Sequence, residues 1–208
     1  MNIRHLLIIL ILSGITTTVD AQRKSWAIGV QVGENFSTLM GETHYDFRPG
    51  WSAGVHLSHY LLDDLVIRLE VNVDDRGAQL NPSLISDPFG ASEYRLTYLS
   101  MPILLRYSTK TRFKIIAGGG ISVDLLLSDD VNFTNPNPTN QPEFRRINAD
   151  IVGCLGGAYP INDRLSLTVE GRSLLGLQSA DRHPGEESRL GRFLSWEVLF
   201  GFNYYLAP

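Results

Sequence analysis

Hydrophobic and polar residues alternate with a period of two along most of the chain. From Leu65 to Val73 every second position is apolar, while Arg68, Glu70 and Asp74 fall on the other face. Only an extended strand places successive side chains on opposite faces, so this pattern predicts a strand with one apolar and one charged face. The same alternation, softened by glycine in two cases, recurs in Trp26–Glu34, Trp51–Leu61, Leu99–Tyr107, Phe113–Leu127, Ala149–Pro160, Leu165–Arg172 and Trp196–Tyr204. The pattern predicts eight strands and no amphipathic helix.

The segments between these strands alternate in length. Short turns are expected at Leu62–Asp64, Ser108–Arg112 and Ile161–Arg164. Long loops are expected at Asn35–Gly50, Asp75–Tyr94, Ser128–Ile147 and Gly176–Arg192. An even number of strands of about ten residues, with short turns at one end and long loops at the other, is typical of an outer-membrane β-barrel.

Periodicity alone does not say which face is outside, because a soluble barrel of the lipocalin type turns its apolar face inward. Here the polar face carries glycine, serine and charges of both signs, which suits a narrow, filled lumen. The residues Trp26, Tyr107, Phe113, Tyr159 and Tyr204 gather near the short-turn ends, where a membrane-interface girdle lies. The last predicted strand is strongly apolar on one face and lies within a few residues of the end of the sequence. We therefore predict an all-β fold, an eight-stranded antiparallel up-and-down transmembrane β-barrel.

The first residues have the layout of a secretory signal peptide. A basic start precedes the apolar run Leu6–Ile15, and the small residues Val19 and Ala21 occupy positions −3 and −1 of a cleavage site. The apolar run is too short for a membrane-spanning helix, which needs about 20 residues. We predict a cleaved signal peptide at residues 1–21 and an outer-membrane β-barrel domain at residues 22–208. The protein is then expected to be integral to a Gram-negative type of outer membrane.

Composition narrows the classes of function. The 208-residue chain has a formal net charge of −4 and no basic stripe, so no nucleic-acid partner is expected. Its single cysteine, Cys154, excludes an intramolecular disulfide and a thiol-rich zinc site.

One segment resembles a known family. Residues 98–107, YLSMPILLRY, are similar to a strand of the PorT-like outer-membrane β-barrel domain family, as are GWSAG at 50–54, DRGA at 75–78 and INDRLSL at 161–167. The likeness runs from Trp26 to Leu206 and implies the same fold and compartment. It also implies a role at the cell envelope, since one type of member takes part in a protein-secretion system.

The chain departs from that family at two points. Ser100 stands where the family usually has glutamate, which removes one carboxylate from the lumen. The chain ends at Pro208 rather than on an aromatic residue, so a barrel-assembly signal would have to be read at Phe202 and Tyr204.

Charged residues on the polar strand faces are the candidate site, because they would point into the lumen. They are Arg68, Glu70, Asp74, Arg106, Lys114, Asp124, Glu170, Arg172 and Glu197. An eight-stranded barrel encloses just enough room for side chains, and charges buried there must pair or carry a large desolvation cost. We therefore expect a mutually paired lumen polar network that plugs the barrel. An ion pathway is the alternative.

No catalytic, cofactor or metal site is expected. Eight-stranded acyltransferase barrels use a loop histidine with Asp and Ser, but His44 and His183 follow no such spacing. His56 and His59 lie on opposite faces of one strand and cannot share a metal. The segment Ser128–Asn132 lacks the spacing of a calcium loop.

The long loops are the expected place of recognition, because exposed loops on a rigid barrel carry it. Their apolar and aromatic residues either bind a partner or fold over the rim: Phe36, Leu39, Met40, Tyr45, Phe47, Leu84, Ile85, Phe89, Phe133 and Phe144. We expect a non-enzymatic envelope structural or interaction protein, with an accessory role in a secretion complex implied by the resemblance. Its expected partners are outer-membrane lipid and an envelope protein that binds the loops. The alternatives are a small passive channel and, less favoured, a lipid-modifying enzyme.

Overall fold

The computed structural model describes residues 26–40, 45–80, 91–133, 143–180 and 191–206. Its strands are β1 (Trp26–Met40), β2 (Tyr45–Asp46), β3 (Arg48–Tyr60), β4 (Leu65–Leu80), β5 (Ala91–Ser108), β6 (Lys114–Phe133), β7 (Ile147–Pro160), β8 (Leu165–Ser179) and β9 (Arg192–Tyr205). Within these ranges no helix is long and apolar enough to cross a membrane. The predicted signal peptide, residues 1–21, lies outside the described residues.

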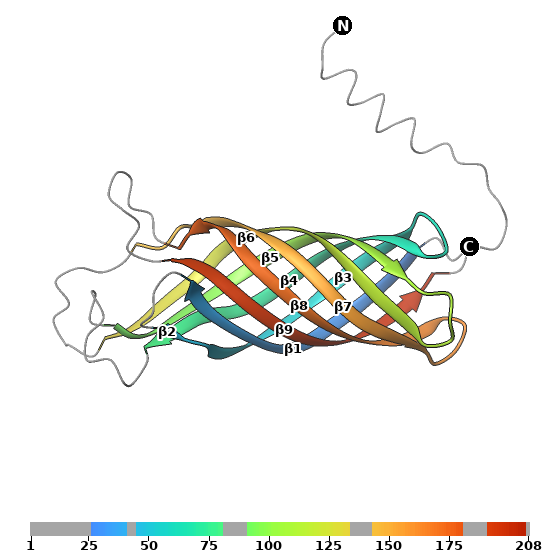
Figure 1. Cartoon of the computed structure of the whole chain (residues 1–208), viewed down its shortest axis with the longest axis horizontal. Helices are drawn as coiled ribbons and strands as arrows, with labels where there is room; N and C mark the ends of the chain where they lie inside the picture. Colours follow the sequence, from blue (N-terminus) through green and yellow to red (C-terminus); the bar gives the residue numbers. More distant parts are fainter. Residues whose placement is uncertain (1–25, 41–44, 81–90, 134–142, 181–190, 207–208) are drawn as a thin grey trace, which may run out of the picture.

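The long strands close into one antiparallel barrel (Figure 1). Strand β1 pairs with β3 on one side and with β9 on the other, from Ala27 opposite Tyr205 to Met40 opposite Arg192. Strand β4 pairs with β5, which completes the ring, while the two-residue β2 extends the edge of β4. The predicted eight-stranded up-and-down barrel is confirmed. The short turns, the start of β1 and the end of β9 lie at one end, and the end of β1 and the start of β9 lie at the other, called here the long-loop end (Figure 1).

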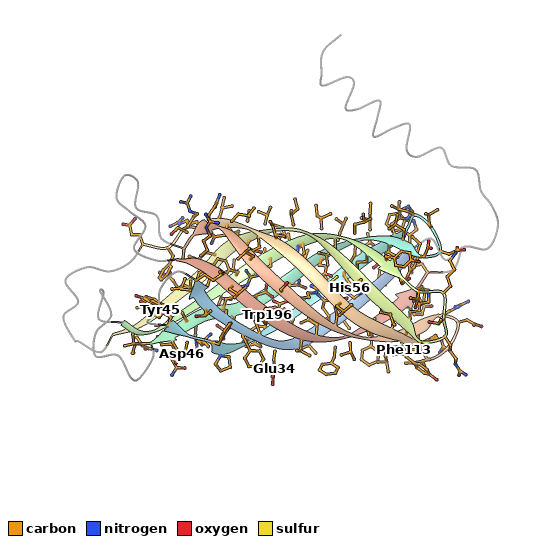
Figure 2. All side chains as sticks on the ribbon, in the orientation of Figure 1. Glu34, Tyr45, Asp46, His56, Phe113 and Trp196 are labelled. Atoms are coloured by element: carbon orange, nitrogen blue, oxygen red, sulfur yellow. The ribbon has the colours of Figure 1, made fainter. Side chains whose placement is uncertain are left out.

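The apolar faces of the strands point outward, as predicted. Along β9, Phe202 is 50% exposed whereas the next residue, Asn203, is 4% exposed. The predicted girdle residues at the short-turn end, such as Phe113, are exposed on the outer wall (Figure 2). Trp196 is exposed farther along the same wall, towards the long-loop end (Figure 2), and Trp51 is also exposed. Since lipid faces the outside, an apolar outer wall bounded by aromatic residues is what a membrane-spanning barrel requires.

At the long-loop end the strands extend beyond the predicted boundaries. The predicted loop ranges therefore include residues that belong to strands. Strand β1 continues to Met40, β4 to Leu80 and β6 to Phe133, while β5 already begins at Ala91. The alternation continues in these extensions but inverts. Outward residues become polar and exposed (Gln79, Arg95, Asp129), whereas inward residues become apolar and buried (Ala78, Leu96).

The inverted segments build an apolar core inside the long-loop end of the barrel. This extracellular apolar cluster consists of Leu39, Tyr45, Ala78, Tyr94, Leu96, Tyr98, Phe144, Ala180 and Phe193. The prediction that Leu39, Tyr45 and Phe144 are exposed loop residues is therefore wrong. Phe36, Met40 and Phe47 are exposed, and Leu84, Ile85 and Phe89 lie outside the described residues. In water, beyond the lipid belt, apolar side chains gain by turning inward.

Candidate functional site

Polar side chains occupy most of the barrel interior at alternate strand positions, beside a small buried apolar cluster of Leu104, Val152 and Leu174. Along β4, starting from the short-turn end, the inward residues are Arg68, Glu70, Asn72, Asp74 and Arg76, and each is at most 4% exposed. This order along one strand places a basic residue at each end and acidic residues between them.

One cluster of charges forms around Arg172 on β8. Its guanidinium donates to both oxygens of Glu70, with Nη1–Oε2 at 2.6 Å and Nη2–Oε1 at 2.8 Å. Its Nε donates to Oε1 of Glu170 at 2.7 Å, and Oε2 of Glu170 accepts from Arg106. Gln31 donates to Glu70 from β1 at 2.7 Å. The two-pronged contact between Arg172 and Glu70 spans the interior from β8 to β4, which is a strong and directional form of ion pair.

A second cluster forms around Arg76, nearer the long-loop end. Its Nη1 donates to Oδ2 of Asp150 at 2.6 Å and to Oδ2 of Asp124 at 3.2 Å. Its Nη2 donates to Oδ2 of Asp74 at 2.9 Å and to the hydroxyl of Ser100 at 3.1 Å. One arginine therefore holds three buried carboxylates from three strands. Serine hydroxyls donate to two of these carboxylates, at 2.6 Å each: Ser52 to Asp74 and Ser122 to Asp124.

Two charged residues of this second cluster are absent from the predicted site. Arg76 falls beyond Val73, where the apolar alternation on β4 ends, so the sequence pattern assigns it to a loop. Asp150 lies at the start of a glycine-rich strand with weak alternation. Counting in twos from Asp74 would have placed Arg76 inward, and counting in twos from Cys154 would have done the same for Asp150.

Two of the predicted residues, Arg68 and Glu197, have fewer charged contacts than the residues at the centres of these clusters. Arg68 donates to Ser58 at 3.1 Å and to Asn203 at 3.0 Å, and it lies 3.8 Å from Glu70. Glu197 is buried and accepts a hydrogen bond from Asn35 Nδ2 at 3.3 Å.

Neither Glu197 nor Lys114 forms an ion pair with another described residue. Lys114 is half-buried at the start of β6. The structure thus joins the predicted Arg68, Glu70, Asp74, Arg106, Asp124, Glu170 and Arg172 in ion-paired clusters, and leaves Glu197 and Lys114 outside them.

Glycines on the inner face make room for the network. A Cβ atom at Gly29 would lie 2.3 Å from His56 Nε2, and one at Gly54 would lie 2.0 Å from Asn72 Oδ1. His56 uses that space to reach Asn203, with Nε2 and Oδ1 2.7 Å apart. Glycine is required at these two positions because polar side chains from neighbouring strands occupy the volume of a methyl group.

The polar network and the extracellular apolar cluster meet at Tyr98. The Arg76 guanidinium lies over the Tyr98 ring, 5.6 Å from its centroid, and the Tyr98 hydroxyl accepts from Asn148 at 3.2 Å. The ring of Tyr98 also meets Phe193 edge-on within the cluster. Charged and apolar layers therefore follow each other directly along the barrel axis, and together they fill it.

The histidines and the cysteine considered in the sequence analysis do not form a site in the described part of the chain. His56 points inward, and His59 stacks on Trp26 with ring centroids 4.3 Å apart, so the two histidines do lie on opposite faces. Cys154 is buried and carries a free thiol. In the part of the chain that the structure describes, no three His, Cys, Asp or Glu side chains are arranged to hold a metal ion. His44 and His183 lie outside that part.

The fold has matches among known proteins. A family described as "Outer membrane protein beta-barrel domain" matches residues 20–182. Neisserial surface protein A is 10% identical with a TM-score of 0.55, over 87% of this chain and 97% of that one. OprG from Pseudomonas aeruginosa is 13% identical with a TM-score of 0.56, over 89% and 98%. Outer membrane protein W of E. coli is 10% identical with a TM-score of 0.52, over 89% and 100%. At such sequence identities, the likeness to these structures shows the fold alone. Among curated proteins, no relative matches the sequence.

Proposed function

Because the chain belongs to the outer membrane protein beta-barrel domain family and is an integral outer-membrane barrel, we propose a role at the cell envelope. We propose that it is non-enzymatic, conducts no ions and presents an interaction surface. The observation that carries this proposal is the filled lumen. Charged clusters occupy the interior across the lipid belt, and the extracellular apolar cluster occupies it beyond.

A steady ion current needs a continuous path for water and ions. Such a path would have to pass Arg172 and Arg76, each of which bonds to carboxylates from other strands. Opening it would leave buried charges unpaired, at a cost of about 3–5 kcal/mol for each broken pair. An ion-selective pore also tends to present rings of one sign, whereas here β4 carries inward residues of both signs.

The long-loop end, which is the extracellular end in barrels of this type, supplies the interaction surface. There Arg48 donates from Nε to Glu93 at 2.6 Å and lies 3.1 Å from Asp75, so that β3, β4 and β5 are held together above the belt. At this end Met40, the last residue of β1, and Phe47, which precedes Arg48 in the chain, are exposed at 45% and 46%. Exposed apolar side chains on a rigid scaffold favour recognition of a protein partner. The resemblance to the PorT-like family supports a narrower role, as an accessory of a secretion complex.

Two measurements test this proposal. Pure wild-type protein in planar bilayers should carry no steady current, and large, regular single-channel openings would favour the passive channel instead. In affinity purification from detergent-solubilised envelopes, wild-type protein should retain a partner that Phe47→Ser loses. The control is Leu62→Ser, which changes an exposed apolar residue in a short turn at the opposite end. Equal recovery with both variants would refute the extracellular interaction surface. A lipid-extract assay tests the lipid-modifying alternative.

A further inference from the structure

A vestibule opens at the short-turn end of the barrel, which is the periplasmic end in barrels of this type. It has a volume of about 410 Å³, and its walls include Tyr60, Leu61, Lys114, Pro160 and Tyr205. These residues come from the strand ends and turns around the mouth of the barrel. The vestibule is separate from the proposed interaction surface, because it lies at the other end of the strands.

A smaller recess continues from the vestibule into the barrel. Its volume is about 30 Å³, and it shares Tyr60, Lys114 and Tyr205 with the vestibule. Its inner wall is formed in part by Arg68 and Arg106. A volume of about 30 Å³ corresponds to roughly one water molecule, so the recess can hold one oxygen atom of a larger group whose remainder sits in the vestibule.

The recess is positively charged. Arg68, Arg106 and Lys114 line it, and none of the described residues lining it is an aspartate or a glutamate. Glu170 engages one nitrogen of Arg106, but the buried Nε of Arg106 has no hydrogen-bond partner among the described residues. Arg68 donates hydrogen bonds to the neutral Ser58 and Asn203, and its ion pair with Glu70 is long, at 3.8 Å.

Lys114 adds to the positive charge of the recess because no described carboxylate pairs with it. Asp63 is the one acidic residue in the described wall of the outer vestibule. Lys114, which has no described carboxylate partner, and Arg106, which has one unpartnered nitrogen, therefore both line a space that opens toward the periplasm.

We propose that this vestibule binds a phosphate group presented from the periplasmic side, with one oxygen in the recess between Arg68, Arg106 and Lys114. Arginine and lysine donors form strong charge-assisted hydrogen bonds to phosphate. The apolar wall at Leu61 and Pro160 leaves room for an uncharged remainder of the ligand. The phosphate belongs either to a periplasmic solute or to the headgroup of an inner-leaflet lipid, and the two share this chemistry.

Calorimetric titration with inorganic phosphate tests the site, using the full barrel in a nonionic detergent and chloride at equal ionic strength as the reference. Wild-type protein should bind phosphate, and Lys114→Gln should weaken binding about tenfold or more. Lys114 holds no ion pair with another described residue, so the variant should fold. The control is Lys110→Gln, in the neighbouring turn, where the side chain is 67% exposed and lies 3.8 Å from Asp64. This control should bind within about twofold of wild type.

The source of the phosphate is separated by repeating the titration in lipid nanodiscs. If a lipid headgroup is the ligand, inorganic phosphate should bind in detergent but be displaced in nanodiscs rich in phosphatidylglycerol. If a solute is the ligand, binding should be equal in both. The absence of phosphate binding to wild-type protein in detergent overturns the proposal. Equal affinities for wild type and Lys114→Gln, or equal losses in the two lysine variants, overturn it as well.

Discussion

Arg76 is the residue on which the polar cluster nearer the long-loop end depends. The substitution Arg76→Met keeps the length of the stem and removes the guanidinium. It abolishes the bonds to Asp74, Asp124, Asp150 and Ser100 at once. Three carboxylates would then face each other in a closed interior without a described cation in contact.

The expected cost follows from the burial of these groups. Arg76 and its three carboxylates are all at most 3% exposed, so solvent does not screen them. Breaking one buried pair by removing a partner costs about 3–5 kcal/mol, and here three carboxylates lose the same partner. We expect Arg76→Met to lower the free energy of unfolding by at least about 3 kcal/mol. Adding Asp150→Asn to that variant should restore part of the loss, because it removes one of the stranded charges.

Denaturant unfolding of the barrel in lipid vesicles measures this effect. The matched control is Arg95→Met, which removes an exposed arginine from the outer face of β5, where Arg95 pairs in register with Gly77. The control should change the free energy of unfolding by less than about 0.5 kcal/mol. Equal effects of the two substitutions would refute the reasoning, because the Arg76 cluster would then add nothing beyond a surface charge.

Further substitutions test other parts of the structure. Ile67→Arg, on the lipid-facing wall of β4, should cost about 2–4 kcal/mol of folding free energy in vesicles, whereas Gln79→Arg on the same face beyond the belt should cost about 0–1. Leu96→Ala, in the extracellular apolar cluster, should cost about 2–5 kcal/mol, and a cost below about 1 would mean that the cluster is not packed. Glu197→Gln should cost less than about 1 kcal/mol in the same assay, because Glu197 forms no ion pair with another described residue. N-terminal sequencing of the mature protein should begin at Gln22, and an uncleaved chain would contradict the predicted signal peptide.

The fold was predictable because the membrane imposes a simple pattern on the strands. In lipid most outward positions are apolar, so segments such as Leu65–Val73 show clear alternation. The short turns also followed from the sequence, since the polar residues of Ile161–Arg164 separate two clear strands. The strand ends beyond the belt did not follow. There water replaces lipid outside the barrel, the alternation inverts, and the inverted stretch reads as a polar loop.

The candidate site was predictable in part for the same reason. Residues inside the belt, such as Glu70 and Arg172, sit opposite clear apolar neighbours and were assigned to the interior. Arg76 lies at the level where the pattern inverts, and its role depends on Asp124 and Asp150 from other strands. Such contacts between strands are set by register, which a single sequence does not reveal. The isolation of Lys114 from every described carboxylate likewise appears only once the strands are placed side by side.

The two halves of the interior meet different physical requirements. Inside the belt, lipid surrounds the wall, so turning apolar side chains inward would gain little, and the interior is held by ion pairs such as Arg172–Glu70. Beyond the belt water surrounds the wall, so Leu96 and Phe193 gain from burial as they would in a soluble protein. Tyr98 joins the halves by packing in the apolar cluster and lying under the Arg76 guanidinium. The same strands therefore reverse their faces where the surrounding solvent changes, and both halves leave the interior closed.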